Sequence, residues 1–161
     1  MKKMLCLMVL VLGFPAVGAG GDGNVCRPVD ATAYETDFLI GEDVCDGWDY
    51  CIPSTLTGTF VGTMMEYFSI AYEMFDVFGT GDPVNTYAGE TRISTRHGDI
   101  SSTGHGSYGY SSYLWTEILL VKGGTGKYES ATGRIVMYNF PNAPVQPIGG
   151  MITLTGFICT P

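Results

Sequence analysis

The side chains best suited to chemistry in this sequence are two pairs on segments of alternating polarity. Glu90 and Arg92 share one face of a strand predicted over residues 87–95, and Trp115 and Glu117 share a face of the next long strand. A charged side chain in an apolar interior is costly unless it is paired, so an inward Glu90 or Glu117 would mark a ligand-binding site. The alternative, which is the more usual arrangement for charged residues on strands, is that these side chains lie on the solvated exterior and form cross-strand ion pairs.

Two further candidates lie between predicted strands. Residues 105–113 alternate aromatic and small side chains, and rigid tyrosine rings on a flexible loop suit contact with sugars, peptides or another subunit. Ordinary surface turn structure explains the same composition. His97, followed by Gly98 and Asp99, is a candidate acid or base, although a turn histidine is the simpler interpretation.

The motifs of known catalytic and metal centres are missing from the sequence. It contains no G-x-S-x-G turn that would expose a nucleophile. It also has no C-x-x-C spacing, and its two histidines, His97 and His105, are not spaced as zinc ligands usually are. We therefore predict no catalytic motif residue, no metal site and no cofactor.

The N-terminal segment has the three parts of a secretory signal peptide. Two lysines follow the initiating methionine, residues 4–12 form an unbroken apolar run, and residues 17–19 are small enough for cleavage. We predict a signal peptide over 1–19, a mature start near Gly20 and a secreted or periplasmic protein. The apolar run is too short for a transmembrane helix and no other long one follows, so we expect no stable membrane insertion.

The remaining chain is strongly acidic. The sequence has 8 basic and 16 acidic residues, a formal net charge of −8, and two of the basic residues lie in the predicted signal peptide. Nucleic acids and anionic membranes attract clustered Lys and Arg, whereas the remaining ones are scattered along this chain. We therefore expect no nucleic acid partner, and solubility and self-repulsion explain the acidity.

Four cysteines follow the signal peptide, and an even number in an oxidising compartment predicts two disulfides. Four cysteines allow three pairings. We favour Cys45 with Cys51, which closes a short glycine-containing loop, and Cys26 with Cys159, which ties the two termini. The long closure should stabilise the fold more, because it restricts the unfolded chain more.

The elements that position these residues are predicted to be short strands. From residue 56 onward, segments rich in Thr, Val, Ile, Tyr and Phe are separated by glycines, as in antiparallel β domains. Glycine within a strand is unfavourable in a flat sheet but expected where strands bend to close a barrel. We therefore predict an all-β fold, a small antiparallel closed barrel of about eight strands. The candidate strands are 56–64, 68–75, 87–95, 113–122, 131–138 and 151–159, with turns at 79–83, 101–112, 123–126 and 139–147.

Two segments fit more than one structure. Residues 64–78 show strand alternation from Phe68 onward but also match a helical stripe, and we favour the strand. Residues 20–55 contain two prolines, and we predict that they form an N-terminal arm with one short strand near 38–40, which disulfides join covalently to the barrel. The chain is then one domain, with the arm at 20–55 and the barrel at 56–161.

The run Gly-Gly-Thr-Gly-Lys-Tyr-Glu-Ser-Ala-Thr-Gly at 123–133 resembles the allene oxide cyclase and dirigent group of small, calycin-like barrels. In that group a G-G-T-G-[KR]-[YF] turn precedes an A-x-G strand. Residues 57–62 look like its early glycine-punctuated strand, and 154–158 look like a closing one. A phosphate-binding loop is excluded, because Val121 and Tyr128 occupy positions where that motif needs Gly and Ser or Thr.

The resemblance implies an eight-stranded barrel with an apolar cavity, often assembled into dimers or trimers. Members of the group guide cyclisation or radical coupling of small hydrophobic compounds, mostly through the shape of a pocket. Their functional residues lie on strands outside the matching motif, so none is carried over to this chain. The predicted N-terminal arm departs from the group, which puts a shared activity in doubt more than a shared fold.

Three functions fit these observations. The leading hypothesis is a secreted barrel that binds a hydrophobic or amphipathic small molecule in its lumen without turnover. The alternatives are a cofactor-free isomerase or cyclase with a buried carboxylate as acid or base, and an extracellular interaction module that uses Tyr-rich loops. An apolar lumen would favour binding, a buried glutamate with a raised pKa would favour catalysis, and a solidly packed lumen would favour the interaction module.

Overall fold

Strands that neighbour each other in the sheet pair antiparallel throughout the described chain. The computed structural model describes residues 24–74, 84–109, 114–139 and 150–161. Within them the order of strands in the sheet is β1-β9-β8-β7-β6-β5-β4-β3-β2. The elements are β1 (Val25–Glu35), β2 (Leu39–Ile40), β3 (Tyr50–Gly58), β4 (Gly62–Met74), β5 (Val84–Thr95), β6 (Gly98–Gly109), β7 (Trp115–Gly124), the 3-10 helix η1 (Gly126–Tyr128), β8 (Thr132–Asn139) and β9 (Met151–Thr160).

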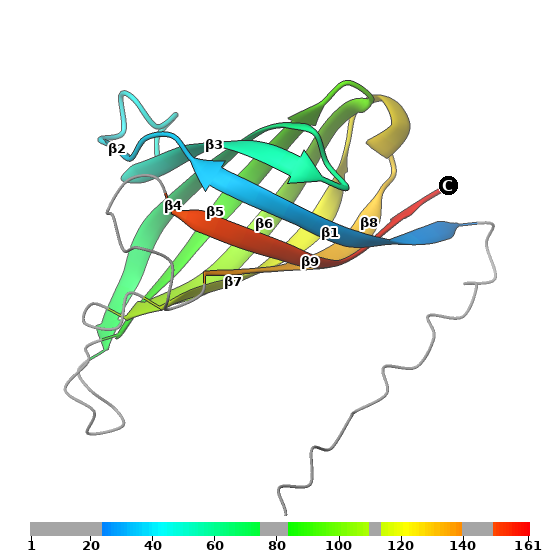
Figure 1. Cartoon of the computed structure of the whole chain (residues 1–161). Helices are drawn as coiled ribbons and strands as arrows, with labels where there is room; N and C mark the ends of the chain where they lie inside the picture. The colour runs from blue at the N-terminus through cyan, green and yellow to red at the C-terminus, as the bar shows by residue number, and fades with distance from the viewer. Residues whose placement is uncertain (1–23, 75–83, 110–113, 140–149) are drawn as a thin grey trace, which may run out of the picture.

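Strand β1 closes this sheet into a barrel. It pairs with β9 along one edge, and its second half, from Ala31 onward, also pairs with β3. The two pairings complete a closed antiparallel ring of eight strands, while the short β2 adds only to the edge of β3. Figure 1 shows the tilted strands surrounding a common interior. The predicted all-β, closed-barrel fold is confirmed.

Side chains alternate between the inside and the outside of this barrel along each strand. On β7 the inward Glu117, Leu119 and Val121 are buried, whereas Leu120 and Lys122 between and after them are exposed. This is the two-residue period of a pleated strand with one face in the core. The alternation therefore decides which residue types can meet in the lumen.

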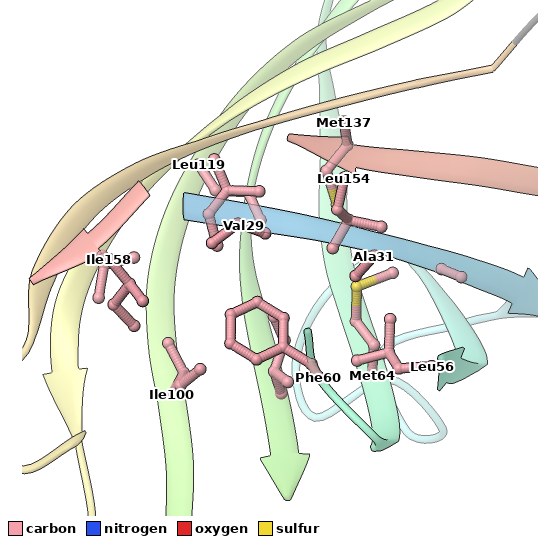
Figure 2. Packing of buried hydrophobic residues seen from close by; sticks show 14 of the residues in the cluster. Val29, Ala31, Leu56, Phe60, Met64, Ile100, Leu119, Met137, Leu154 and Ile158 are labelled. Carbon is pink, nitrogen blue, oxygen red and sulfur yellow. The ribbon is translucent and has the colours of Figure 1, made fainter. Parts of the chain in front are cut away.

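One end of the lumen is filled by apolar side chains, and we call it the packed end. Figure 2 shows Phe60, Met64 and Ile100 directed into the same space as Val29 and Ile158. Phe60 comes from the turn between β3 and β4 and is only 2% exposed, so its ring lies in the core. Burial of one such side chain stabilises the fold by about 1.5–3 kcal/mol.

Glycines within the strands allow the bends that the barrel needs. Gly133 on β8 and Gly156 on β9 have φ angles of 155° and 145°, which residues with a side chain rarely adopt. A Cβ atom at Gly156 would overlap the carbonyl oxygen of Arg134 on the neighbouring strand. The close approach of backbones explains why glycine occupies these strand positions.

Two predicted boundaries were wrong. Residues 20–55 do not form an arm with a single short strand, because β1 and most of β3 belong to the barrel wall. The inward residues of β1 include Ala31 and Ala33, whose small size hides the strand in a hydrophobicity pattern. The predicted strand over 56–64 instead spans the turn between β3 and β4.

The largest error among the predicted strands is that β6 was missed. The glycine- and serine-rich stretch 101–112 was predicted as a turn, but β6 extends through Gly98–Gly109. The segment 64–78 is a strand as far as Met74, as favoured over a helix. The signal peptide at 1–19, the turn at 79–83 and most of the proline-rich turn at 139–147 lie outside the described residues.

Both favoured disulfides are formed. Cys26 and Cys159 face each other across β1 and β9, and Cys45 is joined to Cys51 at the start of β3. Disulfides are typical of extracellular and periplasmic proteins. Among the described residues, no helix is long and apolar enough to cross a membrane.

We expect Cys26→Ser/Cys159→Ser to lose more stability than Cys45→Ser/Cys51→Ser. In the chain-entropy model the first bond stabilises by about 5 kcal/mol and the second by about 2 kcal/mol, because they close loops of very different length. Urea unfolding of the wild type and both double variants measures the difference. Equal losses, or a larger loss from the short loop, would contradict this expectation.

Candidate functional site

Two glutamates lie in the lumen beyond the packed end. Glu66 on β4 and Glu117 on β7 are each only 1% exposed. Each follows the inward alternation of its strand, next to the buried Met64 and Leu119 respectively. Burial of two carboxyl groups in a barrel of this size is costly, so the arrangement requires a physical explanation.

Glycines on β5 and β6 make room for these carboxyl groups. Gly89 and Gly104 pair directly with each other, and Gly106, the next inward residue of β6, pairs with Glu117. A Cβ atom at Gly104 would overlap the Glu117 carboxyl, and one at Gly106 would overlap the Tyr87 ring. The inner face of β6 is therefore small because side chains of neighbouring strands lie over it.

Hydrogen bonding in this region is incomplete. The Tyr87 hydroxyl donates to Oε2 of Glu117 over 3.3 Å. Apart from its side-chain contact with the Glu117 carboxyl, Glu66 has no hydrogen-bond partner for either carboxyl oxygen among the described residues, and Oγ of Ser54 and Oγ1 of Thr91 have none. Thr91 is the direct strand partner of Glu66, and Ser54 pairs with Met64 two residues before it. The unpartnered oxygens thus form one polar patch on β3, β4 and β5.

Burial changes the protonation of both glutamates. Burial, and then the nearby Glu117 charge, raise the pKa of Glu66 well above its ordinary value. Burial raises the pKa of Glu117 to about 7, although its contacts with Glu66 and Tyr87 act in the opposite direction. Burial therefore disfavours the ionised form of both glutamates, and the pKa of about 7 for Glu117 places a change of protonation near neutral pH. The pair can hold or release a proton near pH 7.

A third carboxyl group, Glu35, lies at the end of β1. The backbone N–H of Gly150 donates to its Oε2 over 3.2 Å. Burial raises the pKa of Glu35, and this hydrogen bond lowers it. The Glu35 charge in turn raises the pKa values of Glu66 and Tyr87, so it contributes to the same electrostatic environment. We call the end of the lumen that holds Glu35, Glu66 and Glu117 the carboxyl end.

Aromatic rings form a continuous row at the carboxyl end, which we call the aromatic ladder. It comprises Phe38, Tyr50, Phe68, Tyr87 and Trp115, with successive ring centroids 5.7, 5.4, 5.1 and 6.3 Å apart. These spacings are typical of attractive aromatic pairs. Tyr87 belongs to the ladder and also bonds to Glu117, so the apolar wall and the carboxyl groups are one continuous site.

The structure brings together one of the two predicted pairs. Trp115 and Glu117 both contribute to the lumen, whereas Glu90 and Arg92 lie on the outer face. There Nη1 of Arg92 lies 3.2 Å from Oδ2 of Asp46, and Nη2 of Arg92 lies 3.9 Å from Oε2 of Glu90. The side chains of Asp46 and Glu90 are each exposed by about half or more. The preference for an exterior face was correct for Glu90 and wrong for Glu117.

Sequence reasoning missed Glu66, Glu35 and Tyr87. A signal for Glu66 was present, because it stands between Met64 and Phe68 at the inward positions of one alternating strand. A lone acidic residue in such a series is either an error in the register or a buried group. The contribution of Glu35 could not be found, because its strand was not recognised.

Both histidines are exposed, on the outside of the barrel. His97 is exposed in the turn between β5 and β6 and accepts a hydrogen bond from Nε of Arg96 over 3.0 Å. His105 lies on strand β6 and not in the predicted Tyr-rich loop, whose residues 110–113 are outside the described chain. It is exposed and lines an open hollow of about 500 Å³ with Ala88 and Ile118.

We expect the stability of the protein to fall as pH rises from about 4.5 to about 7, through Glu117. Its pKa is 4.5 when the chain is unfolded and about 7 when it is folded, so ionisation favours the unfolded chain in this window. The shift corresponds to about 3 kcal/mol. Urea unfolding at pH 4.5 and 7.5 should show that Glu117→Gln removes this part of the fall, whereas the exposed Glu90→Gln keeps it. An unchanged pH dependence in Glu117→Gln would exclude the shift.

We also expect Gly104→Ala to destabilise the barrel, because the new Cβ overlaps the Glu117 carboxyl. The loss should be about 1–3 kcal/mol, as for other overpacked cores. In a Glu117→Ala background the same change should cost much less, since the carboxyl is gone. A double-mutant cycle by urea unfolding measures the coupling, and simple additivity would mean that Glu117 does not lie over Gly104.

Comparison with known proteins gives no further assignment. No protein-family model matches the chain, and no curated protein or solved structure is significantly similar to it. The motif at 123–133 forms the end of β7, η1 and the start of β8, at the packed end of the barrel. It therefore has an architectural place in the fold.

Proposed function

We propose that this barrel binds a small amphipathic molecule in the carboxyl end of its lumen. The apolar part of the molecule packs on the aromatic ladder, and its polar group bonds to Glu66 and Glu117. The observation that carries the proposal is the polar patch around the Glu66 carboxyl, which is 1% exposed. Beyond the contact of Glu66 with Glu117, neither Glu66 nor the hydroxyl groups of Ser54 and Thr91 have a hydrogen-bond partner among the described residues.

The energetics of buried polar groups support a bound ligand. An unpartnered buried donor or acceptor costs about 1–3 kcal/mol, and the patch contains such atoms on Ser54 and Thr91, beside a Glu66 carboxyl whose contact is Glu117. Apolar residues at these positions would avoid that cost, as they do at the packed end. A ligand that bonds to the patch would offset it. The aromatic ladder supplies large, rigid contact surfaces beside the patch.

Acid–base turnover is the second candidate function. A general base works best when its pKa lies near the working pH, and burial raises that of Glu117 to about 7. The Tyr87 hydroxyl bonds to the same carboxyl, so a proton taken up there is held in a defined geometry. By the criterion that a buried glutamate with a raised pKa favours catalysis, the isomerase or cyclase hypothesis gains support. It agrees with what the resemblance of 123–133 implies.

The interaction-module hypothesis has lost its main argument. It relied on a flexible Tyr-rich loop at 105–113, but residues 105–109 belong to strand β6.

For location, we propose an extracytoplasmic protein, secreted or periplasmic. Two disulfides and the sequence pattern of 1–19 support this. The ligand is then a compound that reaches that compartment.

We expect the protein purified from its own host to retain a small molecule in native mass spectrometry. It should also bind the neutral dye N-phenyl-1-naphthylamine, with an increase in the fluorescence of the dye. Trp115→Ala should weaken dye binding about three- to tenfold, since one ring of the wall is lost, and Trp48→Ala should not. No retained mass together with no dye binding would refute lumenal binding.

A second experiment in the same host distinguishes binding from turnover. The Glu117→Gln variant, whose residue 117 cannot act as a base, is purified from the host. The compound that it retains is extracted and added to the wild-type protein. Recovery of the unchanged compound indicates binding alone. Recovery of an isomer of equal mass indicates acid–base turnover, and it would identify Glu117 as the catalytic base.

A further inference from the structure

We infer that the ligand carries a cation, a protonated amine on an apolar and largely planar body, and that this ammonium group binds beside Glu66 and Glu117, with Glu35 adding to the negative charge around it. The inference deepens the proposed function and rests on it. It names the chemical class of the polar group, which neither the fold nor the resemblance of the 123–133 motif specifies.

The charges around the carboxyl end are of one sign. Glu35, Glu66 and Glu117 approach from β1, β4 and β7, and β5 contributes the hydroxyl groups of Tyr87 and Thr91. Strands β6, β8 and β9 contribute uncharged side chains there. In the part of the chain that the structure describes, every basic residue and histidine is exposed, namely Arg27, Arg92, Arg96, His97, His105, Lys122, Lys127 and Arg134.

The hydrogen-bonding patch matches a donor. An ammonium group has three N–H donors and no acceptor, whereas an ionised carboxylate is an acceptor only. Both oxygens of Glu66 and the hydroxyl oxygens of Ser54 and Thr91 can accept. A carboxylate or phosphate ligand would instead bring a like charge next to three acidic groups, with no described basic side chain to bind it.

The aromatic ladder favours the same kind of ligand. The face of an aromatic ring attracts a cation within about 6 Å of its centroid, and the attraction is stronger where water is excluded. The ring centroids of Phe68 and Tyr87 lie 5.1 Å apart beside the glutamates, and Tyr87 is 4% exposed. An ammonium beside these rings would gain cation–π attraction in addition to its bonds to the carboxyl groups.

A metal ion is a poorer match than an organic cation. Among the described residues, no three His, Cys, Asp or Glu side chains are grouped closely enough to hold a metal. Ca²⁺ and Mg²⁺ need six or more oxygen ligands, and aromatic rings supply none. An organic ammonium needs only a few acceptors and uses the rings as well.

Binding of a cation should release protons. Without one, burial disfavours the ionised forms of Glu66 and Glu117, and the pKa of Glu117 is about 7. A bound ammonium reverses this preference, so the carboxyl groups ionise as it binds. Affinity should therefore rise about tenfold per pH unit below pH 7 for each proton released.

The test compares three probes with the same aromatic body: 3-phenylpropylamine, 3-phenylpropan-1-ol and 3-phenylpropanoic acid. We expect isothermal titration at pH 7.5 to show the amine binding at least about tenfold more tightly than the alcohol, with no binding of the acid. Titration in phosphate and in MOPS reports the protons released. Glu66→Gln and Glu117→Gln should weaken amine binding and reduce proton release, whereas Glu90→Gln on the outer face should change neither.

The outcomes separate this inference from the proposed function. If N-phenyl-1-naphthylamine binds but the alcohol or the acid equals or exceeds the amine, or no probe binds, the lumen binds ligands and the cation assignment is wrong. If the amine binds equally well to Glu66→Gln and Glu117→Gln, its site lies elsewhere and the assignment is also wrong. If neither dye nor probes bind and no mass is retained, the proposed function itself fails.

Discussion

The pairing of β1 with both β9 and β3 is the constraint on which this structure depends. An open sheet would expose the inward faces of these strands to water. Closure converts them into a lumen of limited volume, in which each large inward side chain needs a small neighbour. Cys26 and Cys159 lock one of the two closing pairs covalently. The inside of the barrel, and therefore any chemistry in it, exists only while β1 holds its place.

The limited volume is used differently at the two ends of the lumen. At the packed end, apolar side chains from most of the strands fill the space, and Phe60 is buried among them. At the carboxyl end, β6 contributes glycines, and the space above them is occupied by Glu117 and Tyr87 from the neighbouring strands. The apolar core extends to Met137, the strand partner of Glu117, and beside it the carboxyl end contains polar groups that the described chain satisfies only in part.

The sequence was informative where side-chain chemistry and strand alternation agreed. It predicted the closed all-β barrel, both disulfides and the pairing of Trp115 with Glu117 on one strand face. It failed at β6, where Gly104 and Gly106 are glycines because Glu117 and Tyr87, from other strands, lie over them. It also failed at β1, where Ala31 and Ala33 give a weak hydrophobic signal. In each case the size of the inward residue is set by a tertiary contact, which a local pattern cannot contain.

The two ends of the described chain lie side by side, since Val25 pairs with Thr160 on the neighbouring strand. Both are at the packed end, far along β1 from Glu35. A fusion partner, an affinity tag or a surface linker joined directly to Asn24 or to Pro161 would therefore start opposite the aromatic ladder and leave it accessible. The same geometry would allow an immobilised form of the barrel, with its carboxyl end directed toward the solution.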